Sequence, residues 1–405
     1  MQPIDCPYLL ITCIDCYRDS EGHRYLDQLW YKDLIEHFKY LKNFTLAAPC
    51  RYEAPPPGSV RLDNDPAFAG VQFVDLPAPN SFGQAVRQLP QTFKILWQAI
   101  ARAEVVHTGV AGWPIPPGWL VTPLIYLRKK FYLIIVESAF WRVEPNAPSS
   151  WKARLRAGLS EQINRWCLNK TDLAIFTQQE YRQSLLTHRP ERGHIIHASW
   201  IDEENVLAAE VAQESWKTKV NPETSRLKLL YAGRLSSGKG VSLLLQAIEK
   251  LSQESFPVQL DILGQGDLRG EAEKLQQQLQ GPTRVNLLGT VPYGPALFQL
   301  IRDYHAVVLP LITDEQPRIV YDAYSQAVPV LASNTNGLRD CVQDGQTGKL
   351  FAANDTIALV NAIRWAAANL PELSDRGMTS LEVARKMTHQ EMHRQRWQLL
   401  LQALA

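Results

Sequence analysis

Continuous apolar runs alternate with amphipathic stretches along the first half of the chain, which predicts strands followed by helices. Residues 8–14 form a run typical of a buried strand, and residues 25–41 repeat apolar positions at helical spacing. Further strands are predicted at residues 44–47, 71–74, 105–107, 133–136, 173–176 and 195–197. Two stretches rich in proline and glycine, 51–66 and 109–123, predict loops.

The second half repeats this alternation more regularly. Strands are predicted at residues 227–232, 258–263, 285–288, 306–309 and 330–332, with helices at 241–251, 267–280, 295–303 and 317–327. Apolar strands of this kind indicate parallel sheets covered by helices on both sides. Residues 200–226 contain no predicted strand, so we expect two α/β domains, residues 1–200 and 201–388. A capping-box pattern at Thr388 and Glu391 predicts a last helix over 389–405.

The composition is that of an ordinary soluble globular protein, long enough for two hydrophobic cores. Of 405 residues, 45% are hydrophobic, and 42 Lys and Arg balance 41 Asp and Glu, so no nucleic-acid partner is expected. No secretory signal is recognised, and no apolar run reaches the ~18–20 residues that span a bilayer. Six cysteines do not make a disulfide framework in such a chain, and a cytoplasmic location fits.

Gly233, Arg234, Lys239 and Gly240 surround a short loop where the strand 227–232 gives way to a helix. In an open parallel sheet, ligands bind at the carboxyl ends of the strands, where helix N-termini point inward. A guanidinium and an ammonium at this place can neutralise a diphosphate, and the guanidinium offers a planar fork to phosphate oxygens. For each cation taken alone, a solvated surface loop is the alternative.

Asp314 and Asp322 lie eight residues apart around a helix start predicted at Pro317. Backbone N–H groups near Arg318 would face an anion or a sugar hydroxyl, and Asp322 falls on the same helical face as Arg318. Carboxylates accept hydrogen bonds from the vicinal hydroxyls of a hexose or a ribose. Alternatively, Asp314 or Glu315 caps the helix and Asp322 pairs with Arg318. Together with the two cations, the carboxylates describe a nucleotide-sugar site.

Over residues 228–350, the chain resembles the donor domain of glycosyltransferase family 4, which comprises retaining enzymes of the GT-B fold. The shared motifs are Gly233-Arg234-Leu235 with Lys239-Gly240, Gly264-Gln265-Gly266, Asp314 and Asp322 in place of two Glu, Val328-Pro329-Val330-Leu331-Ala332, Gly337 to Asp340, and Asp344 to Gly348. This resemblance implies an α/β protein with two Rossmann-like domains whose parallel sheets face across a cleft. It also implies that the last helix crosses back to the first domain.

The resemblance also implies roles for individual residues. Arg234 and Lys239, as catalytic residues, would bind the donor phosphates, and Asp314 would hold the transferred sugar. The remaining donor-binding residues would be Gly233, Gly264, Gly289, Val291, Gln316, Pro317, Arg318 and Asp322, with Asp322 on the ribose and Gly264 and the turn 288–291 against the base. No metal and no cofactor are expected, since the nucleoside diphosphate sugar is a substrate.

The first domain resembles the family only in architecture. The acceptor-side histidine of the family, expected after the strand 133–136, is replaced by Glu137, and the glycine-rich turn after the first strand is reduced to a segment around Gly22. His107, at the end of another predicted strand, is a further candidate for the acceptor side. The alternatives are a packing role for His107 and a surface ion pair between Glu137 and Arg142.

Residues 151–167 alternate basic and apolar positions, beginning at Trp151. An amphipathic helix of this kind can lie on an anionic membrane, and a solvated helical face is the alternative. Asp63-Asn64-Asp65 has the form of a metal-binding D-x-D, but turn chemistry explains it better, because no acidic partner follows.

The predicted function is therefore transfer of a sugar from a nucleoside diphosphate to a hydroxyl with retention, in polysaccharide, glycolipid or cell-envelope glycan synthesis. The acceptor would be a glycan or a lipid-linked glycan, and the protein could contact the inner face of the membrane peripherally. A non-catalytic sugar-nucleotide-binding subunit of a glycan-assembly complex is the alternative. The missing histidine and the shortened acids motivate that alternative.

Overall fold

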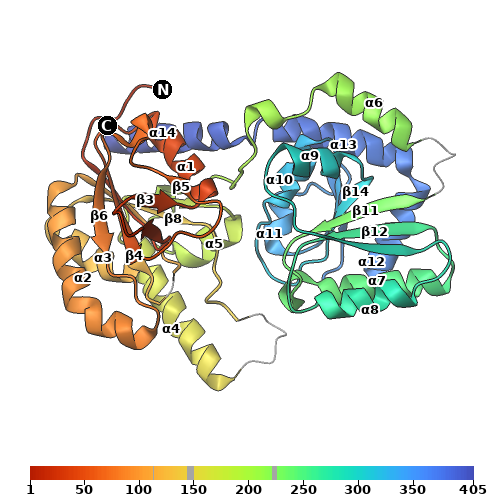
Figure 1. Ribbon diagram of the computed structural model, residues 1–405, viewed down its shortest axis with the longest axis horizontal. Helices are drawn as coiled ribbons and strands as arrows, with labels where there is room; N and C mark the ends of the chain where they lie inside the picture. Colours follow the sequence, from red (N-terminus) through yellow and green to blue (C-terminus); the bar gives the residue numbers. More distant parts are fainter. Residues whose placement is uncertain (113, 144–149, 221–225) are drawn as a thin grey trace. The chain divides into compact units, whose positions relative to one another are not determined.

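The chain forms two compact units, each built on its own parallel sheet (Figure 1). The computed structural model describes residues 1–112, 114–143, 150–220 and 226–405. The first unit comprises Met1–Ile196 with His393–Ala405, and the second comprises His197–Met392. The two parallel-sheet domains confirm the predicted α/β class. Residue 113 of the predicted loop 109–123 and residues 221–225 of the predicted break lie outside the described residues.

The first sheet has the order β10-β9-β8-β7-β1-β4, and β6 pairs with the other side of β4. All of these pairs are parallel, and a small extension of β2, β3 and β5 continues from the end of β4. The strands are β1 (Tyr8–Ile11), β2 (Cys16–Arg18), β3 (Arg24–Leu26), β4 (Phe44–Tyr52), β5 (Val60–Arg61), β6 (Gln72–Leu76), β7 (Val105–Thr108), β8 (Phe131–Val136), β9 (Leu173–Phe176) and β10 (Gly193–Ile195).

Helices cover both faces of the first sheet, because successive residues of its strands point to opposite sides. Leu9 packs with one core cluster, on the side of α2 to α5, and Leu10 packs with the other, on the side of α1 and α14. The helices are α1 (Gln28–Phe38), α2 (Phe82–Arg102), α3 (Pro117–Arg128), α4 (Trp151–Leu168), α5 (Gln179–Leu185) and α14 (His389–Leu404). On α14, Leu400 is buried in the second cluster and the Trp397 indole N–H donates to the carbonyl of Gln2.

The second sheet is entirely parallel, with the order β13-β12-β11-β14-β15-β16. Its strands are β11 (Leu227–Ala232), β12 (Val258–Leu263), β13 (Arg284–Gly289), β14 (Ala306–Leu309), β15 (Val330–Ser333) and β16 (Gly348–Phe351). Its helices are α6 (Ala209–Lys219), α7 (Val241–Gln253), α8 (Arg269–Gln278), α9 (Pro295–Arg302), α10 (Ile319–Ser325), α11 (Asn336–Arg339), α12 (Thr356–Ala368) and α13 (Leu370–Ala384). Helices α7, α8 and α12 pack on one face, and α9 and α10 on the other (Figure 1).

The strand order fixes where each sheet can bind a ligand. In both sheets the chain winds outward from a central strand in one direction and then returns to continue in the other. The reversal falls between β1 and β7 in the first sheet and between β11 and β14 in the second. Loops from the carboxyl ends of such neighbouring strands diverge, which leaves a crevice for a ligand.

Several elements differ from the sequence prediction, and three of the differences concern where a helix begins. Helix α3 begins at Pro117, inside the predicted loop 109–123, because a proline is tolerated in the first turn of a helix. The predicted helix over residues 25–41 is divided into β3 and α1, and Asp27 accepts hydrogen bonds from the first turn of α1. Helix α10 begins at Ile319 instead of residue 317.

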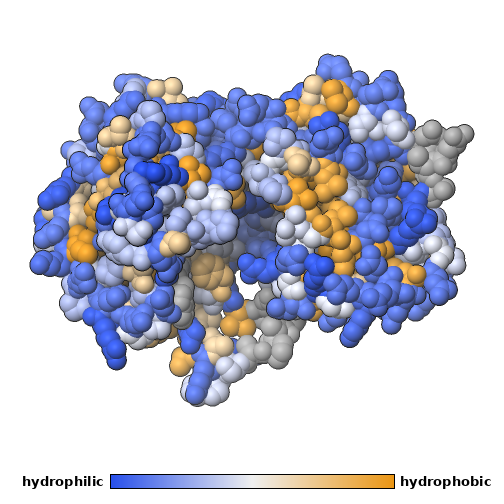
Figure 2. All heavy atoms as spheres, viewed as in Figure 1, coloured by the Kyte–Doolittle hydropathy of each residue, from blue (hydrophilic) through white to orange (hydrophobic). Residues whose placement is uncertain are grey.

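The N-terminal part of α4 carries large apolar side chains in solvent. Trp151, Leu155 and Leu159 recur every four residues, so they share one face, and they are 70%, 65% and 60% exposed. Exposed Lys152 and Arg156 lie beside this stripe. In Figure 2, orange and pale orange spheres accordingly lie among blue ones over α4. No helix of the described residues is long and apolar enough to cross a membrane.

Gly240 joins the loop after β11 to α7 in a conformation that only glycine adopts easily. Its φ is +70°, and a Cβ there would lie 1.7 Å from the carbonyl oxygen of Pro310, which follows β14. The two loops therefore touch through their backbones. Gly270, in the first turn of α8, has nothing within 4 Å of the equivalent position.

We predict that Gly240→Ala lowers the free energy of unfolding by at least ~2 kcal/mol, since a left-handed alanine costs about 1–2 kcal/mol before the clash is counted. Gly270→Ala is the matched control and is expected to stabilise by about 0.5–1 kcal/mol. Urea unfolding of both variants measures the difference. Equal unfolding midpoints for the two variants would contradict the prediction.

Candidate functional site

The loop after β11 presents backbone and one exposed cation at the crevice of the second sheet. The Gly233 N–H donates to the carbonyl of Leu263, at a distance of 2.9 Å. The side chain of Arg234 is exposed, and it has no hydrogen-bond or ion-pair partner among the described residues. The Tyr231 hydroxyl donates to the Arg234 carbonyl at 2.8 Å, and this hydrogen bond holds the backbone of the loop against β11.

Glycines at the ends of β11, β12 and β13 form a floor without side chains. A Cβ on Gly264 would lie 1.9 Å from the carbonyl oxygen of Gly233, and one on Gly266 would lie 2.3 Å from that of Leu235. The Gly264 N–H donates to Gly289 at 2.7 Å. The backbones of three adjacent strand ends therefore pack directly on one another, without intervening side chains.

Lys239 lies across the crevice from the loop after β14. Its Nζ is 2.7 Å from Oε1 of Glu315, and the Thr313 hydroxyl donates to the same carboxylate oxygen. The structure thus places Lys239 at the switch point, as expected from the sequence, with an ion pair to Glu315 that the sequence analysis did not predict. Both side chains are partly exposed, so the pair is weak and an incoming phosphate can compete for the ammonium.

Asp314 is positioned by α11 rather than by α10. Its two carboxylate oxygens accept from the backbone N–H and the side-chain amide of Asn336, at 2.8 and 2.9 Å. The alternative in which Asp314 caps the helix that follows it is therefore wrong, because the capped residue belongs to another helix. The carboxylate remains exposed beside the loop after β14.

Asp322 lies on α10 with its carboxylate buried, at 4% exposure. It accepts a hydrogen bond of 2.9 Å from the hydroxyl of Tyr293. Burial, together with the charge of Asp322, raises the pKa of Tyr293, which therefore stays a donor. Arg318, one turn earlier on the chain, places its guanidinium over the ring of Trp200.

The remaining donor-side candidates lie near these groups. Gln316 and Pro317 precede α10, and the Gln316 side-chain amide donates to the hydroxyl of Tyr321. Val291 follows β13 and packs at the edge of the core around α9. All of these candidates sit on loops or helix starts at the carboxyl edge of one sheet.

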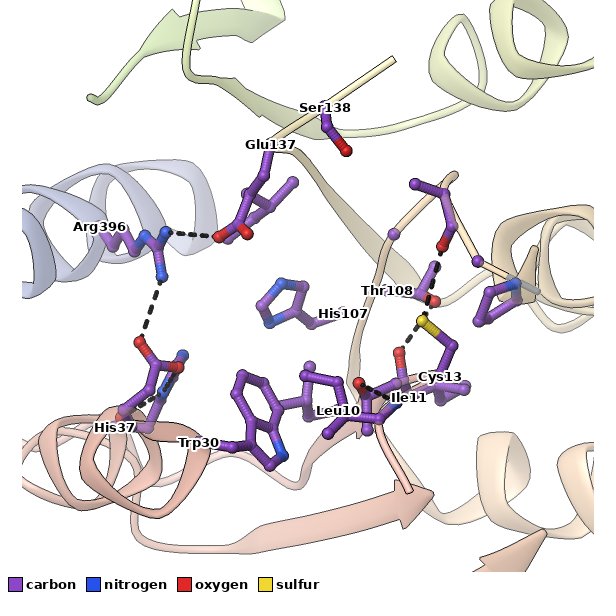
Figure 3. Close-up of a pocket in the computed structure, with 18 of the residues that line it drawn as sticks. Leu10, Ile11, Cys13, Trp30, His37, His107, Thr108, Glu137, Ser138 and Arg396 are labelled. Carbon is purple, nitrogen blue, oxygen red and sulfur yellow. Dashed lines mark hydrogen bonds and ion pairs between the residues drawn. The ribbon is translucent and has the colours of Figure 1, made fainter. Parts of the chain in front are cut away.

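The first unit has a cavity of about 220 Å³ at its own switch point (Figure 3). Its described lining comes from the ends of β1, β7 and β8 and from helices α1 and α14. Polar and aromatic lining residues include Thr12, Trp30, Asp33, His37, His107, Glu137 and Arg396. Of the three acceptor-side candidates, His107 and Glu137 are therefore brought together, whereas Gly22 is not in the described lining and turns the hairpin between β2 and β3.

His107 lies near the middle of this cavity in Figure 3, and its Nδ1 is 2.8 Å from the hydroxyl oxygen of Tyr8. Burial lowers the pKa of His107 well below its ordinary value. The imidazole is therefore neutral at physiological pH and can offer one ring nitrogen to a ligand.

Glu137 pairs with a residue that the sequence analysis missed. Its Oε1 lies 3.6 Å from Nη2 of Arg396, on α14. The predicted alternative, a pair with Arg142, is wrong because that guanidinium is occupied by Glu161 and Glu180. No local pattern could have identified Arg396, since 259 positions separate it from Glu137 and only the fold brings them together.

Asp33, His37 and His393 form a buried cluster whose potential ligand atoms lie within 4.8 Å of one another. A metal could occupy such a set, but His393 already uses both ring nitrogens. Its Nε2 is 3.0 Å from Asp33, and its Nδ1 is 3.2 Å from the hydroxyl of Tyr40. The cluster therefore forms a hydrogen-bond network within the protein. Asp65 accepts from the backbone N–H of Ala67, as turn chemistry predicts, whereas Asp63 accepts from the backbone N–H of the distant Arg24.

Comparison with known proteins supports the assignment of the second unit. Residues 226–369 match the family model Glycosyl transferases group 1, so the resemblance stated from the motifs is confirmed over this segment. The glycogen synthase of Mycobacterium tuberculosis is 22% identical over 264 residues, 65% of this chain and 60% of that protein. The phosphatidyl-myo-inositol mannosyltransferase of Mycobacterium leprae is 33% identical over 139 residues, 33% of this chain and 36% of that protein.

The fold of both units together is shared with solved structures. Alr3699/HepE of Anabaena, in complex with UDP, aligns with a TM-score of 0.68 at 14% identity, over 98% of this chain and 99% of that chain. Such a likeness shows the fold, which is the GT-B class of two parallel-sheet domains. The chain spans about 60% of the length of the glycogen synthases it matches.

Proposed function

We propose that the protein is a retaining glycosyltransferase that moves a hexosyl group from a nucleoside diphosphate sugar to a hydroxyl of a glycan or lipid-linked acceptor. The observation that carries the proposal is the switch point of the second sheet, where Arg234 and Lys239 lie beside closely packed glycine backbone. The match of residues 226–369 to group 1 glycosyltransferases supports it. The UDP bound in the structure of HepE supports the class of donor.

Each donor contact follows from the chemistry of the groups. In the reaction, the bond from C1 of the sugar to the diphosphate oxygen breaks, and a bond from C1 to the acceptor oxygen forms. Arg234 and Lys239 would stabilise the charge that develops on the leaving diphosphate. A phosphate oxygen on the acceptor's side would take the hydroxyl proton, so the enzyme needs no separate base. Asp314 would hold the sugar, and Asp322, held by Tyr293, the ribose.

Screening a panel of UDP, GDP and ADP sugars for release of the nucleoside diphosphate would test the proposal. Turnover without any partner protein supports an enzyme, and binding of a donor without turnover would favour the non-catalytic alternative. The relatives named above are a synthase and a transferase, which gives that alternative no support.

We predict that Arg234→Ala and Lys239→Ala each lower the transfer rate about 10- to 150-fold, because a charged hydrogen bond contributes about 1.5–3 kcal/mol. Lys250→Ala, on the exposed surface of α7, is the matched control and should be as active as the wild type. Steady-state kinetics with an active donor measures the effect. Unchanged rates in both loop variants would exclude the phosphate assignment.

Transfer is also predicted to be independent of divalent metal, since two side-chain cations can neutralise the diphosphate. Activity measured after dialysis against EDTA should equal the untreated activity. Loss of activity that Mg²⁺ or Mn²⁺ restores would show that the two cations do not suffice.

A peripheral membrane contact is the remaining part of the proposal, and the exposed stripe of α4 with its basic neighbours supports it. The relative named for phosphatidyl-myo-inositol is consistent with a lipid-linked acceptor. The double variant Trp151→Ser, Leu155→Ser should sediment with anionic vesicles several-fold less than the wild type. Ile357→Ser, at an equally exposed site on α12, is the control. Equal sedimentation of wild type and double variant would rule out this surface.

A further inference from the structure

Arg396 is a buried guanidinium whose donors are largely unused. The side chain is only 7% exposed, and its Nε has no hydrogen-bond partner among the described residues. Its nearest carboxylates are Glu137, at 3.6 Å, and Asp33, at 4.0 Å. Both distances exceed the 2.7–3.2 Å of an N–H···O hydrogen bond, although a guanidinium normally makes short, paired contacts with a carboxylate.

The two carboxylates near Arg396 differ in how firmly they are held. Asp33 is buried, and it is bound by His393 at 3.0 Å and approached by His37 at 3.3 Å. Glu137 is 56% exposed on its side chain, and within the described part of the chain its one ion-pair partner is Arg396. An exposed pair at this distance contributes about 0–1 kcal/mol, so Glu137 can swing into solvent when another anion arrives.

We propose that the cavity of the first unit binds an anionic group of the acceptor, a carboxylate or a phosphate, through the fork of Arg396. In this proposal, which rests on the glycosyltransferase function proposed above, Glu137 occupies the position that the anion of the acceptor takes. The exchange of one carboxylate for another anion keeps a negative charge beside Arg396, so the guanidinium is never buried without a counter-charge.

The chemistry of the lining favours an anion over a neutral sugar at this point. Arg396 is the only Lys or Arg in the described lining, and it comes from α14, the helix at the left of Figure 3. Burial lowers the pKa of both His107 and His393, so neither adds positive charge near neutral pH. A fixed, desolvated guanidinium with free N–H groups recognises two oxygens of one anionic group better than a single hydroxyl.

Calorimetric titration of the full chain tests the proposal with small probes. The anions are inorganic phosphate, glycerate, glucuronate and glucose 6-phosphate, and the neutral probes are glycerol and glucose. All titrations use the double variant Arg234→Ala, Lys239→Ala as the background, so that phosphate binding in the second unit does not contribute. At least one anion is expected to bind with an affinity about tenfold or more above its neutral counterpart. Comparison of glucuronate with glucose 6-phosphate then separates carboxylate from phosphate.

Three substitutions in this background should change the affinity in different directions. Arg396→Gln should weaken anion binding at least about tenfold, and Arg396→Lys should weaken it less, because lysine keeps the charge but lacks the fork. Glu137→Gln should strengthen binding, by up to about fivefold, because it removes the competing carboxylate. A purely structural role for this pair would not produce opposite changes from its two members.

Arg102→Gln, at an exposed position at the end of α2, is the control and should not alter binding. Circular dichroism of each variant establishes that it is folded, and Glu137→Gln keeps the test valid if Arg396→Gln unfolds. Binding of no anion, equal binding of neutral and anionic probes, or weaker binding in Glu137→Gln would each overturn the proposal. None of these outcomes requires a sugar donor, so failure here is distinguishable from failure of the transferase function.

Discussion

Direct contact between backbones at the carboxyl edge of the second sheet is the constraint on which the rest of that unit depends. Gly233, Gly264 and Gly289 end three adjacent strands, and Gly240 presses against the carbonyl of Pro310 after a fourth. Because no side chain intervenes, the loops converge closely enough to place Lys239 beside Glu315. A Cβ at any of the tightest positions would separate the loops and move the cations away from the crevice.

Parallel topology explains why both units place their polar groups at comparable positions. In each sheet the winding direction reverses at one pair of strands, β1 and β7 or β11 and β14, and the candidate residues follow those strands. The two sites nevertheless recognise ligands by different means. In the second unit a ligand would meet glycine backbone, the exposed Arg234 and Lys239 in its pair with Glu315. In the first unit it would meet side chains that line a cavity.

The sequence predicted the second unit far better than the first, for a physical reason. In the second unit, apolar strands recur at regular intervals and glycines occupy positions that need their backbone freedom. Both features can be recognised in short sequence segments, so β11 to β15 and the loop at Arg234 could be predicted. Helix α3 was missed because Pro117 in its first turn and Pro123 in its interior give the segment the composition of a loop. The partners of Asp314 and Asp322 were also missed, since Asn336 and Tyr293 approach only in the folded chain.

The cavity of the first unit depends on contacts that no local sequence pattern predicts. Asp33 on α1, His107 on β7, Glu137 after β8 and Arg396 on α14 contribute one side chain each. Side chains can reach a common cavity from many backbone positions, so the residues of such a site need no fixed spacing in the sequence. Contact between backbones, by contrast, requires glycine at defined positions. Arg396 belongs to this site only because the apolar face of α14, with Leu400 in the core, holds the helix against the first sheet. The cavity is therefore complete only when α14 is packed on the first sheet. A change that loosened this packing would displace Arg396, the only cation of the described lining.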